Sequence, residues 1–210
     1  MKRIALIALI ILAAALQSAA RTGSGVLKGE SVHVKYGIEW GYLASFMNTY
    51  HTVYFDPDAG YRIDGRGTDL FLYSNGYASA KLGVEFLKHY SATVLAGYCG
   101  IRQDRRVFPL TLRASYFFRS YEESGPLAFL EGGAGINFIE ETAPMLCKAG
   151  YGYRLKMSRK SSLDLMVSAQ LSGDHPGIYN PEIPGYVPDI LVRRSDALYG
   201  ACCFSIAINF

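Results

Sequence analysis

Only a few residues of this chain have types and spacings that suggest catalysis. His175 directly follows Asp174, which could orient its ring, and Ser172 and Ser195 are the nearest candidate nucleophiles. A serine, a histidine and an acid together support acyl transfer or hydrolysis. The spacing here matches no known hydrolase element, so no catalytic residue is expected and these side chains are predicted to be solvated.

Two further groups of residues suggest metal binding or cross-linking. Asp56, Asp58 and Gly60 resemble the start of a calcium-binding loop, but the other ligand positions of such a loop are missing. We therefore expect a solvated turn, with no metal and no cofactor. Four cysteines would usually suggest disulfides in an exported chain. The strands proposed below separate them too widely for that, and we expect free thiols at Cys99, Cys147, Cys202 and Cys203.

The elements that would position all these residues are β-strands. Eight segments alternate apolar with small or polar side chains, the period of a strand. Most are close to the roughly 9 to 11 residues that a tilted membrane strand requires. These segments are 32–42, 78–87, 91–100, 110–118, 127–138, 147–157, 162–171 and 198–210.

The two faces of these segments differ sharply in charge. The apolar faces carry no charged residue, whereas the opposite faces carry six bases and four acids. A soluble carrier barrel would turn the apolar face inward, but a membrane barrel turns it outward, because Arg or Lys facing lipid at mid-depth costs about 2 to 4 kcal/mol. In a membrane barrel the lumen would contain Lys35, Glu39, Lys81, Glu85, Arg113, Glu131, Lys148, Arg154, Lys156 and Asp164.

The N-terminal segment indicates export. Lys2 and Arg3 precede an apolar run of 13 residues, and small residues lead up to Ala20, where we place the cleavage site. This run is shorter than the roughly 20 residues of a membrane-spanning helix. Residues 1–20 are therefore predicted to be a signal peptide, and 21–210 a single domain. Cleavage removes two of the 21 basic residues and none of the 18 acidic ones, leaving a charge of +1 that argues against a nucleic-acid partner.

The last strand and the lengths of the connections favour the membrane barrel over the soluble carrier barrel. The final strand presents Phe204, Ile206, Ile208 and Phe210 on one face, as in the closing strand of a membrane barrel. Aromatic residues such as Trp40 and Phe86 lie near the strand ends. The predicted connections contain 35, 3, 9, 8, 8, 4 and 26 residues, so short turns would alternate with longer outside loops.

Several motifs carry a resemblance to a known group. These are the leader, the strand opening at Phe108–Arg113, the Gly-rich run Glu131–Gly135 and the terminal phenylalanine. Together they resemble the small outer-membrane β-barrel proteins of Gram-negative bacteria, and most of all the Bacteroidota-type barrel-domain group. The resemblance implies an all-β, eight-stranded, antiparallel up-and-down barrel in the cell outer membrane. We also expect a monomer that is surrounded by outer-membrane lipid and inserted by the barrel-assembly machinery.

Function is expected in the outside loops, because eight strands enclose only enough space for their own side chains. Segment 43–77 is rich in aromatic residues, and part of it is expected to extend the barrel wall beyond the membrane as a hairpin. Segment 172–197 is rich in prolines. Both suit a protein or glycan ligand, although the same rings could simply pack against one another over the barrel. The sequence predicts a surface-interaction or envelope-integrity protein. The alternatives are a lipid A-modifying enzyme, a narrow channel and a barrel component of a secretion assembly.

Overall fold

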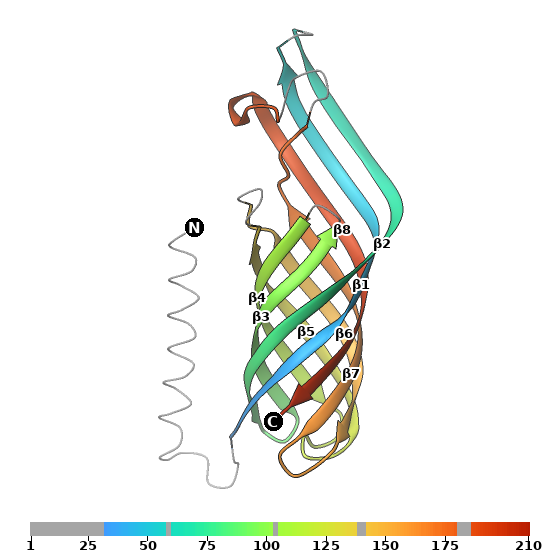
Figure 1. Cartoon of the computed structure of the whole chain (residues 1–210), viewed down its shortest axis with the longest axis vertical. Helices are drawn as coiled ribbons and strands as arrows, with labels where there is room; N and C mark the ends of the chain where they lie inside the picture. Colours follow the sequence, from blue (N-terminus) through green and yellow to red (C-terminus); the bar gives the residue numbers. More distant parts are fainter. Residues whose placement is uncertain (1–31, 58–59, 103–104, 138–141, 180–185) are drawn as a thin grey trace.

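A closed antiparallel barrel of eight strands forms the body of the protein (Figure 1). The computed structural model describes residues 32–57, 60–102, 105–137, 142–179 and 186–210. Each strand pairs with its neighbours in sequence, and β1 pairs with β8 to close the ring. This confirms the predicted fold. The elements are β1 His33–Asp56, β2 Tyr61–Phe86, β3 Tyr90–Arg102, β4 Arg105–Phe117, β5 Gly125–Ile136, β6 Met145–Lys156, β7 Ser162–Asp174, η1 Asp189–Leu191 and β8 Val192–Asn209.

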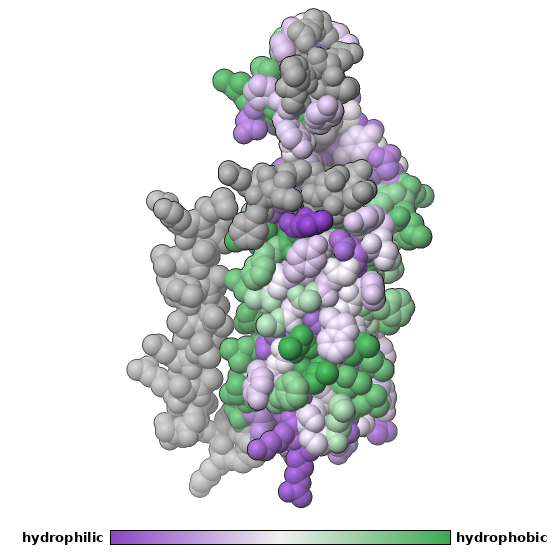
Figure 2. Space-filling view, in the orientation of Figure 1, coloured by the Kyte–Doolittle hydropathy of each residue, from purple (hydrophilic) through white to green (hydrophobic). Residues whose placement is uncertain are grey.

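The barrel wall is apolar outside and polar inside. In β7, Leu165 and Val167 are exposed on the exterior, whereas Asp164 and Ser168, which flank this pair, are buried in the lumen. This alternation follows from the two-residue period of a strand. Figure 2 shows apolar side chains gathered over the barrel wall and hydrophilic ones toward both ends. Within the described ranges, no helix is long and apolar enough to cross a membrane.

The seam between β1 and β8 depends on glycine. The Phe210 amide donates a hydrogen bond to the Tyr36 carbonyl at 2.8 Å, and the two rings stack with centroids 5.9 Å apart. Further along the seam, a Cβ atom at Gly41 would collide with the backbone carbonyl of Phe204. The two strands therefore approach each other too closely here for any side chain.

Aromatic rings form a partial girdle at the end of the barrel that carries the C-terminus. Successive ring centroids in this row lie 5.3 to 6.1 Å apart. Such girdles mark the headgroup level of a membrane barrel, and this end is the periplasmic one. Phe138, another aromatic residue expected at a strand end, lies outside the described residues. The rings of the row are Phe86, Tyr90, Tyr116, Phe118 and Tyr151.

Segment 43–77 is a hairpin extension of the barrel wall and not a loop. β1 continues to Asp56 and β2 starts at Tyr61, with only residues 57–60 between them. β8 starts at Val192 and runs alongside β1. Among the described residues, β2 pairs with β3 only from Tyr77 to Phe86. The parts of β1, β2 and β8 above this paired region form a three-stranded sheet above the barrel (Figure 1). We call this sheet the extension.

A bulge at Phe46 separates the barrel part of β1 from the extension. The pairing of β1 with both neighbours shifts between Ser45 and Met47, which leaves Phe46 unpaired and exposed. Odd-numbered residues of β1 point into the lumen below the bulge, whereas Asn48 is the next buried residue above it. The extension thus has an inner face that continues the lumen side and an outer face that continues the lipid-facing side.

The connections do not alternate in length as predicted. The outside connections contain 4, 2, 8 and 17 residues, and the periplasmic ones 3, 7 and 5. The long predicted outside loops are shorter because their residues are used in strand pairing above the membrane. The proposed signal peptide, residues 1–20, lies outside the described part of the chain.

Candidate functional site

Arg113 occupies the centre of the lumen and bridges two carboxylates. Its Nη1 and Nη2 donate to the two oxygens of Glu39 at 2.6 and 2.9 Å, across the barrel from β4 to β1. Its Nε and Nη2 donate to Glu131 Oε2 at 2.8 and 2.6 Å, on the neighbouring strand. All three side chains are at most 7% exposed. Such two-point contacts between guanidinium and carboxylate are the strongest ion pairs that side chains form.

The same two carboxylates receive further donors. Thr111 Oγ1 donates to Glu131 at 2.8 Å, and the Tyr77 hydroxyl donates to Glu39 at 3.2 Å. Lys81 Nζ lies 3.8 Å from Glu39, and Lys148 Nζ lies 4.0 Å from Glu131. Each carboxylate is thus surrounded by cations and hydroxyls, which offset the cost of removing it from water.

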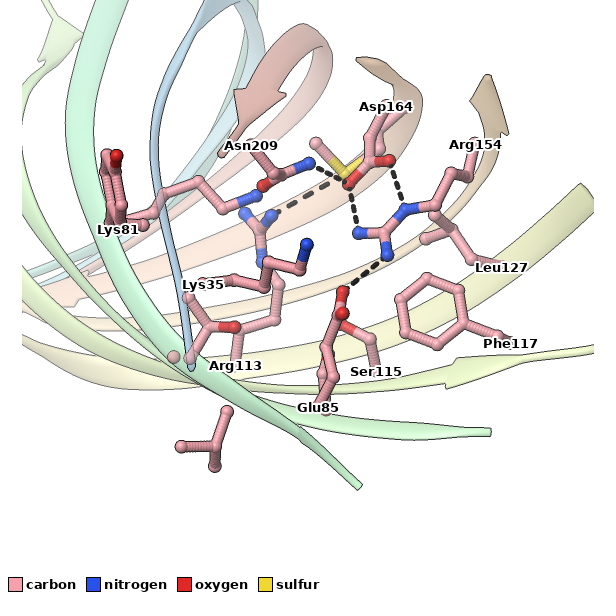
Figure 3. A pocket seen from close by; sticks show the side chains of 16 residues that line it. Lys35, Lys81, Glu85, Arg113, Ser115, Phe117, Leu127, Arg154, Asp164 and Asn209 are labelled. Atoms are coloured by element: carbon pink, nitrogen blue, oxygen red, sulfur yellow. Dashed lines mark hydrogen bonds and ion pairs between the residues drawn. The ribbon is translucent and has the colours of Figure 1, made fainter. Parts of the chain in front are cut away.

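A second cluster lies nearer the periplasmic end, centred on Arg154 (Figure 3). Arg154 contacts both oxygens of Asp164, at 2.7 and 2.9 Å, and donates to Glu85 at 2.5 Å. Asn209 donates to Asp164 at 2.9 Å. The guanidinium carbon of Arg154 lies 4.3 Å from the centre of the Phe117 ring, which adds a cation–π contact.

The buried charges of the two clusters balance. Four cations, Lys81, Arg113, Lys148 and Arg154, face four anions, Glu39, Glu85, Glu131 and Asp164. The two remaining predicted residues, Lys35 and Lys156, lie at the periplasmic end and are half-buried. The structure therefore places the ten predicted lumen residues on the inward side of the wall, and it joins eight of them by ion pairs.

These ion pairs occupy the described part of the lumen, and the two cavities beside them are small. One cavity of about 20 Å³ lies among Lys35, Glu85 and Arg154, and another of about 20 Å³ lies among Tyr77, Thr111 and Lys148. Each has room for about one water molecule. Apolar side chains, including Leu43, Tyr77 and Tyr199, fill the outer end of the barrel. The site is a set of paired charges in an interior whose two cavities are each about the size of a water molecule.

The inner face of the extension is rich in tyrosine. It carries Tyr50 and Tyr54 from β1 and Tyr61 and Tyr73 from β2, in positions that follow from the strand register. A Cβ atom at Gly67 would come within 2.7 Å of the Tyr50 hydroxyl oxygen, so the Tyr50 side chain covers this glycine. Tyr61 is 60% exposed at the tip. We call these four rings the tyrosine face.

The outer face of the extension carries apolar residues near the barrel and charged residues beyond them. His51 contacts Asp64 at 3.1 Å. Asp196 accepts a 2.5 Å hydrogen bond from Arg194 and lies 2.9 Å from the His175 ring. The hydrogen bond from Arg194 contributes most to holding the pKa of Asp196 below its usual value. These contacts lie outside the membrane-spanning part of the barrel.

The predicted arrangement around His175 differs in the structure. Asp174 accepts a hydrogen bond from the His175 backbone amide, and the ring instead contacts Asp196 and the Ser195 carbonyl. Ser195 Oγ donates to the Pro176 carbonyl and has no contact with the imidazole. Among the described residues, no hydrogen bond joins a serine hydroxyl to the His175 ring. His175 helps to fix the connection between β7 and β8.

The acidic residues of the hairpin do not converge either. Asp64 lies on the outer face of β2 and Asp69 on the inner face, because the two positions differ in parity. Asp58 lies outside the described residues. In the ranges that the structure describes, no three His, Cys, Asp or Glu side chains form a group able to hold a metal ion.

All four cysteines are free thiols, as the separation of their strands predicted. Cys147 and Cys202 face the exterior, and Cys99 and Cys203 are buried in the lumen. β7 lies between Cys147 and Cys202, since each pairs with a residue of that strand.

Sequence reasoning missed several partners of the lumen charges. Thr111 lies two residues before Arg113 on the same face, a spacing that could have indicated its role. Tyr77 fell inside a predicted loop, and Asn209 was assigned no role. No sequence signal indicates that Glu39 and Arg113 meet, because their contact spans the barrel.

Comparisons with known proteins support the fold. No family model matches the chain, and no curated protein sequence matches it. Among solved structures, the outer membrane protein OprG from Pseudomonas aeruginosa is 9% identical with a TM-score of 0.50, covering 84% of this chain and 95% of its own. The outer membrane protease OmpT from Escherichia coli is 9% identical with a TM-score of 0.38, covering 89% of this chain and 99% of its own.

The likeness to OprG and the arrangement of the wall agree. A ring of eight paired strands, an apolar exterior and charges confined to the lumen are the features that a bilayer imposes on a strand protein. The chain therefore has the fold of an outer-membrane β-barrel.

Proposed function

We propose that this protein is a non-enzymatic surface-interaction barrel that binds an extracellular protein or glycan through its extension. The observation that carries this proposal is the contrast between the two parts of the molecule. The lumen is filled by balanced ion pairs, whereas three strands continue beyond the barrel and present tyrosine rings to the outside. Binding residues commonly lie on such projections from a rigid scaffold.

The tyrosine face has the chemistry of a recognition surface. Tyr54 and Tyr61 are diagonal neighbours on paired strands, because Tyr54 pairs with Ile63 and Tyr61 with Asp56. Rings so placed lie within reach of one another. Tyrosine offers a large apolar area with one polar group at little cost in conformational entropy. Two further tyrosines, Tyr179 and Tyr186, are 64% and 62% exposed in the connection to β8.

The experiment shortens the hairpin without changing the barrel. Replacing residues 49–68 by Asn-Gly joins Asn48 to Asp69, which pair in the ladder and can be closed by a two-residue turn. We expect a folded barrel that no longer binds glycan arrays or surface proteins that the intact protein binds. A matched control replaces 157–161 by Asn-Gly, because Lys156 pairs with Ser162. Binding that survives loss of the hairpin would contradict the proposal.

The lipid A-modifying enzyme is the main alternative, and the contacts of His175 do not favour it. Profiling lipid A and surface glycans of a deletion strain distinguishes the two functions. Unchanged lipid A acylation is expected, together with greater sensitivity to detergents if the protein supports envelope integrity. The deletion could instead change lipid A acylation. If the variant with residues 49–68 replaced by Asn-Gly then restores the normal acylation in that strain, the enzyme alternative would be favoured.

The remaining assignments are also proposals. We propose a monomer that is inserted by the barrel-assembly machinery, is surrounded by outer-membrane lipid and belongs to the Bacteroidota-type barrel-domain group. A barrel component of a secretion assembly would instead be isolated from native membranes with fixed partners. The apolar exterior that surrounds the described barrel supports the free-standing form.

A further inference from the structure

The extension ends on one side in an open strand edge. β2 forms this border, and above Tyr77 it pairs with β1 but with no other described strand (Figure 1). The segment from Tyr61 to Gly76 contains no proline, so each of its residues has a backbone N–H. Alternate residues turn their N–H and C=O groups toward the open edge. Such an edge is able to accept a further strand.

Charges of alternating sign lie beside this edge. The outer face of β2 near the tip carries Arg62, Asp64 and Arg66 in turn, and all three are exposed. Asp64 contacts His51 through one oxygen, Oδ1, at 3.1 Å. Neither arginine forms an ion pair within the part of the chain that the structure describes. A row of one sign would repel a copy of itself, whereas a row of alternating sign is able to pair with its own reverse.

We propose that the open edge of β2 pairs with the same edge of a second copy of this chain, antiparallel and about a two-fold axis at Gly65. Asp64 of each copy then lies opposite Arg66 of the other, so the contact forms twice, as symmetry requires. Residues 61–69 of one copy pair with residues 69–61 of the other. No two like charges lie opposite each other in this register.

The charges and the fold favour this axis over its neighbours. An axis at Asp64 or at Arg66 would place two identical charges opposite each other. An axis at Ile63 also pairs opposite charges, but it joins only residues 61–65 of each copy. An axis at Phe71 would bring exposed leucines of the two copies together. It would also set each hairpin tip against the part of the partner's β2 that β3 already occupies.

The antiparallel direction places the two barrels in different membranes. β2 runs from the tip to the barrel, so a partner strand of opposite direction has its barrel beyond the tip of the first copy. Two barrels inserted in one bilayer point the same way and cannot pair in this manner. Pairing of β2 with β3 begins at Tyr77, twelve residues from the axis, so the two Tyr77 residues lie about 80 Å apart along the strand direction. The paired edges would thus join the outer membranes of two neighbouring cells.

A second copy fits this edge better than an unrelated strand does, because the charge pattern is its own complement. Nine paired residues form a small interface, so one pair of copies binds weakly. Two facing membranes present many copies, and their contacts act together. The site uses the edge of β2 and not the tyrosine face, so it does not depend on what the tyrosine face binds.

The test counts mixed aggregates of two cell populations. Each population produces the full protein in its outer membrane and a different fluorescent protein, in a host with short surface glycans, and flow cytometry counts two-colour aggregates. We expect wild-type cells to aggregate. Asp64→Arg alone, or Arg66→Asp alone, should give about tenfold fewer aggregates, because like charges then lie opposite each other. Mixing Asp64→Arg cells with Arg66→Asp cells should restore aggregation, because opposite charges meet again.

The matched control is Asp189→Arg, which reverses an exposed charge on the same side of the membrane but away from this edge, and it should aggregate like the wild type. Failure of the mixed variants to restore aggregation would overturn the proposal, as would wild-type cells that adhere equally to host cells lacking the protein. Heat-modified electrophoretic mobility shows that each variant is a folded barrel. All variants keep the tyrosine face, so ligand binding there, measured separately, distinguishes failure of this site from failure of the proposed function.

Discussion

At the scale of single residues, the lumen is organised by two arginines that each hold two carboxylates. Arg113 joins Glu39 to Glu131, and Arg154 joins Asp164 to Glu85. The lysines make longer contacts, at 3.8 and 4.0 Å. A guanidinium can bind two carboxylates in one plane, and an ammonium group lacks this fixed geometry. The stability of the interior therefore rests mainly on the arginine contacts.

Removing one partner from the central cluster should be costly. The variant Glu39→Ala leaves Arg113 buried with only one of its two carboxylates, and we expect the free energy of unfolding to fall by about 3 to 5 kcal/mol. Urea unfolding in lipid vesicles measures this. Lys35→Ala, on the same strand but half-buried at the periplasmic end, should change it by less than about 0.5 kcal/mol. Equal stabilities for the two variants would show that the Glu39 contact contributes little.

The sequence predicted which charges face inward but not how they pair. Inward placement follows from alternation along each strand, so Arg113 and Glu131 could be assigned to the lumen separately. Their pairing requires the strand register, which depends on the seven-residue turn between β4 and β5. The contact of Glu39 with Arg113 requires the stagger of the whole ring. No local pattern contains that information.

At the scale of elements, the β1–β8 seam shows how a small side chain decides whether two strands can pair. Gly41→Ala places a methyl group against the Phe204 carbonyl, so we expect the variant to insert with lower yield or to unfold at lower denaturant concentration. Protection from protease in lipid vesicles measures the folded fraction.

Gly173→Ala is the matched control for this experiment. A Cβ atom at Gly173 would meet no atom within 4 Å, and the residue also lies on a strand that pairs with β8. This control should fold as well as the wild-type protein. If Gly41→Ala folds equally well, the seam is looser than its backbone contacts indicate.

The extension shows why part of the strand pattern escaped sequence analysis. The bulge at Phe46 changes which positions of β1 face inward, so the period of two breaks between Tyr42 and Asn48. In β2 above the barrel, both faces contact water, and neither the tyrosine face nor the charged outer face is uniformly apolar. Alternation between apolar and polar residues appears only where one side of a strand meets lipid or a core.

At the scale of the whole molecule, the fold was predictable because the bilayer constrains it strongly. A strand protein in hydrocarbon must close on itself, and its lipid-facing positions must be apolar. These two requirements account for the eight strands and for the uncharged exterior. The sequence also predicted that part of segment 43–77 extends the wall as a hairpin, but it did not predict the bounds of its strands or the participation of β8, because water places no such demand on strands above the membrane.

The closed interior makes a clear prediction for conductance. The purified protein in planar bilayers should show no stable openings of nanosiemens size, because paired side chains occupy the lumen and each of the two cavities beside them measures only about 20 Å³. A porin measured in the same bilayers serves as the positive control. Long-lived, uniform openings from the wild-type protein would require a lumen that rearranges, and would favour the channel alternative.

The pairing of β1 with β8 also bears on how fast the protein can fold. Gly37 pairs with Asn209, so this contact joins positions 172 residues apart, the difference between the two numbers. Contacts between such distant positions form late and slowly, because the entropy of the intervening chain opposes them. Until they form, the nascent sheet has two open edges that can recruit other unfinished copies. Slow ring closure would therefore make the half-built barrel the stage most prone to aggregation.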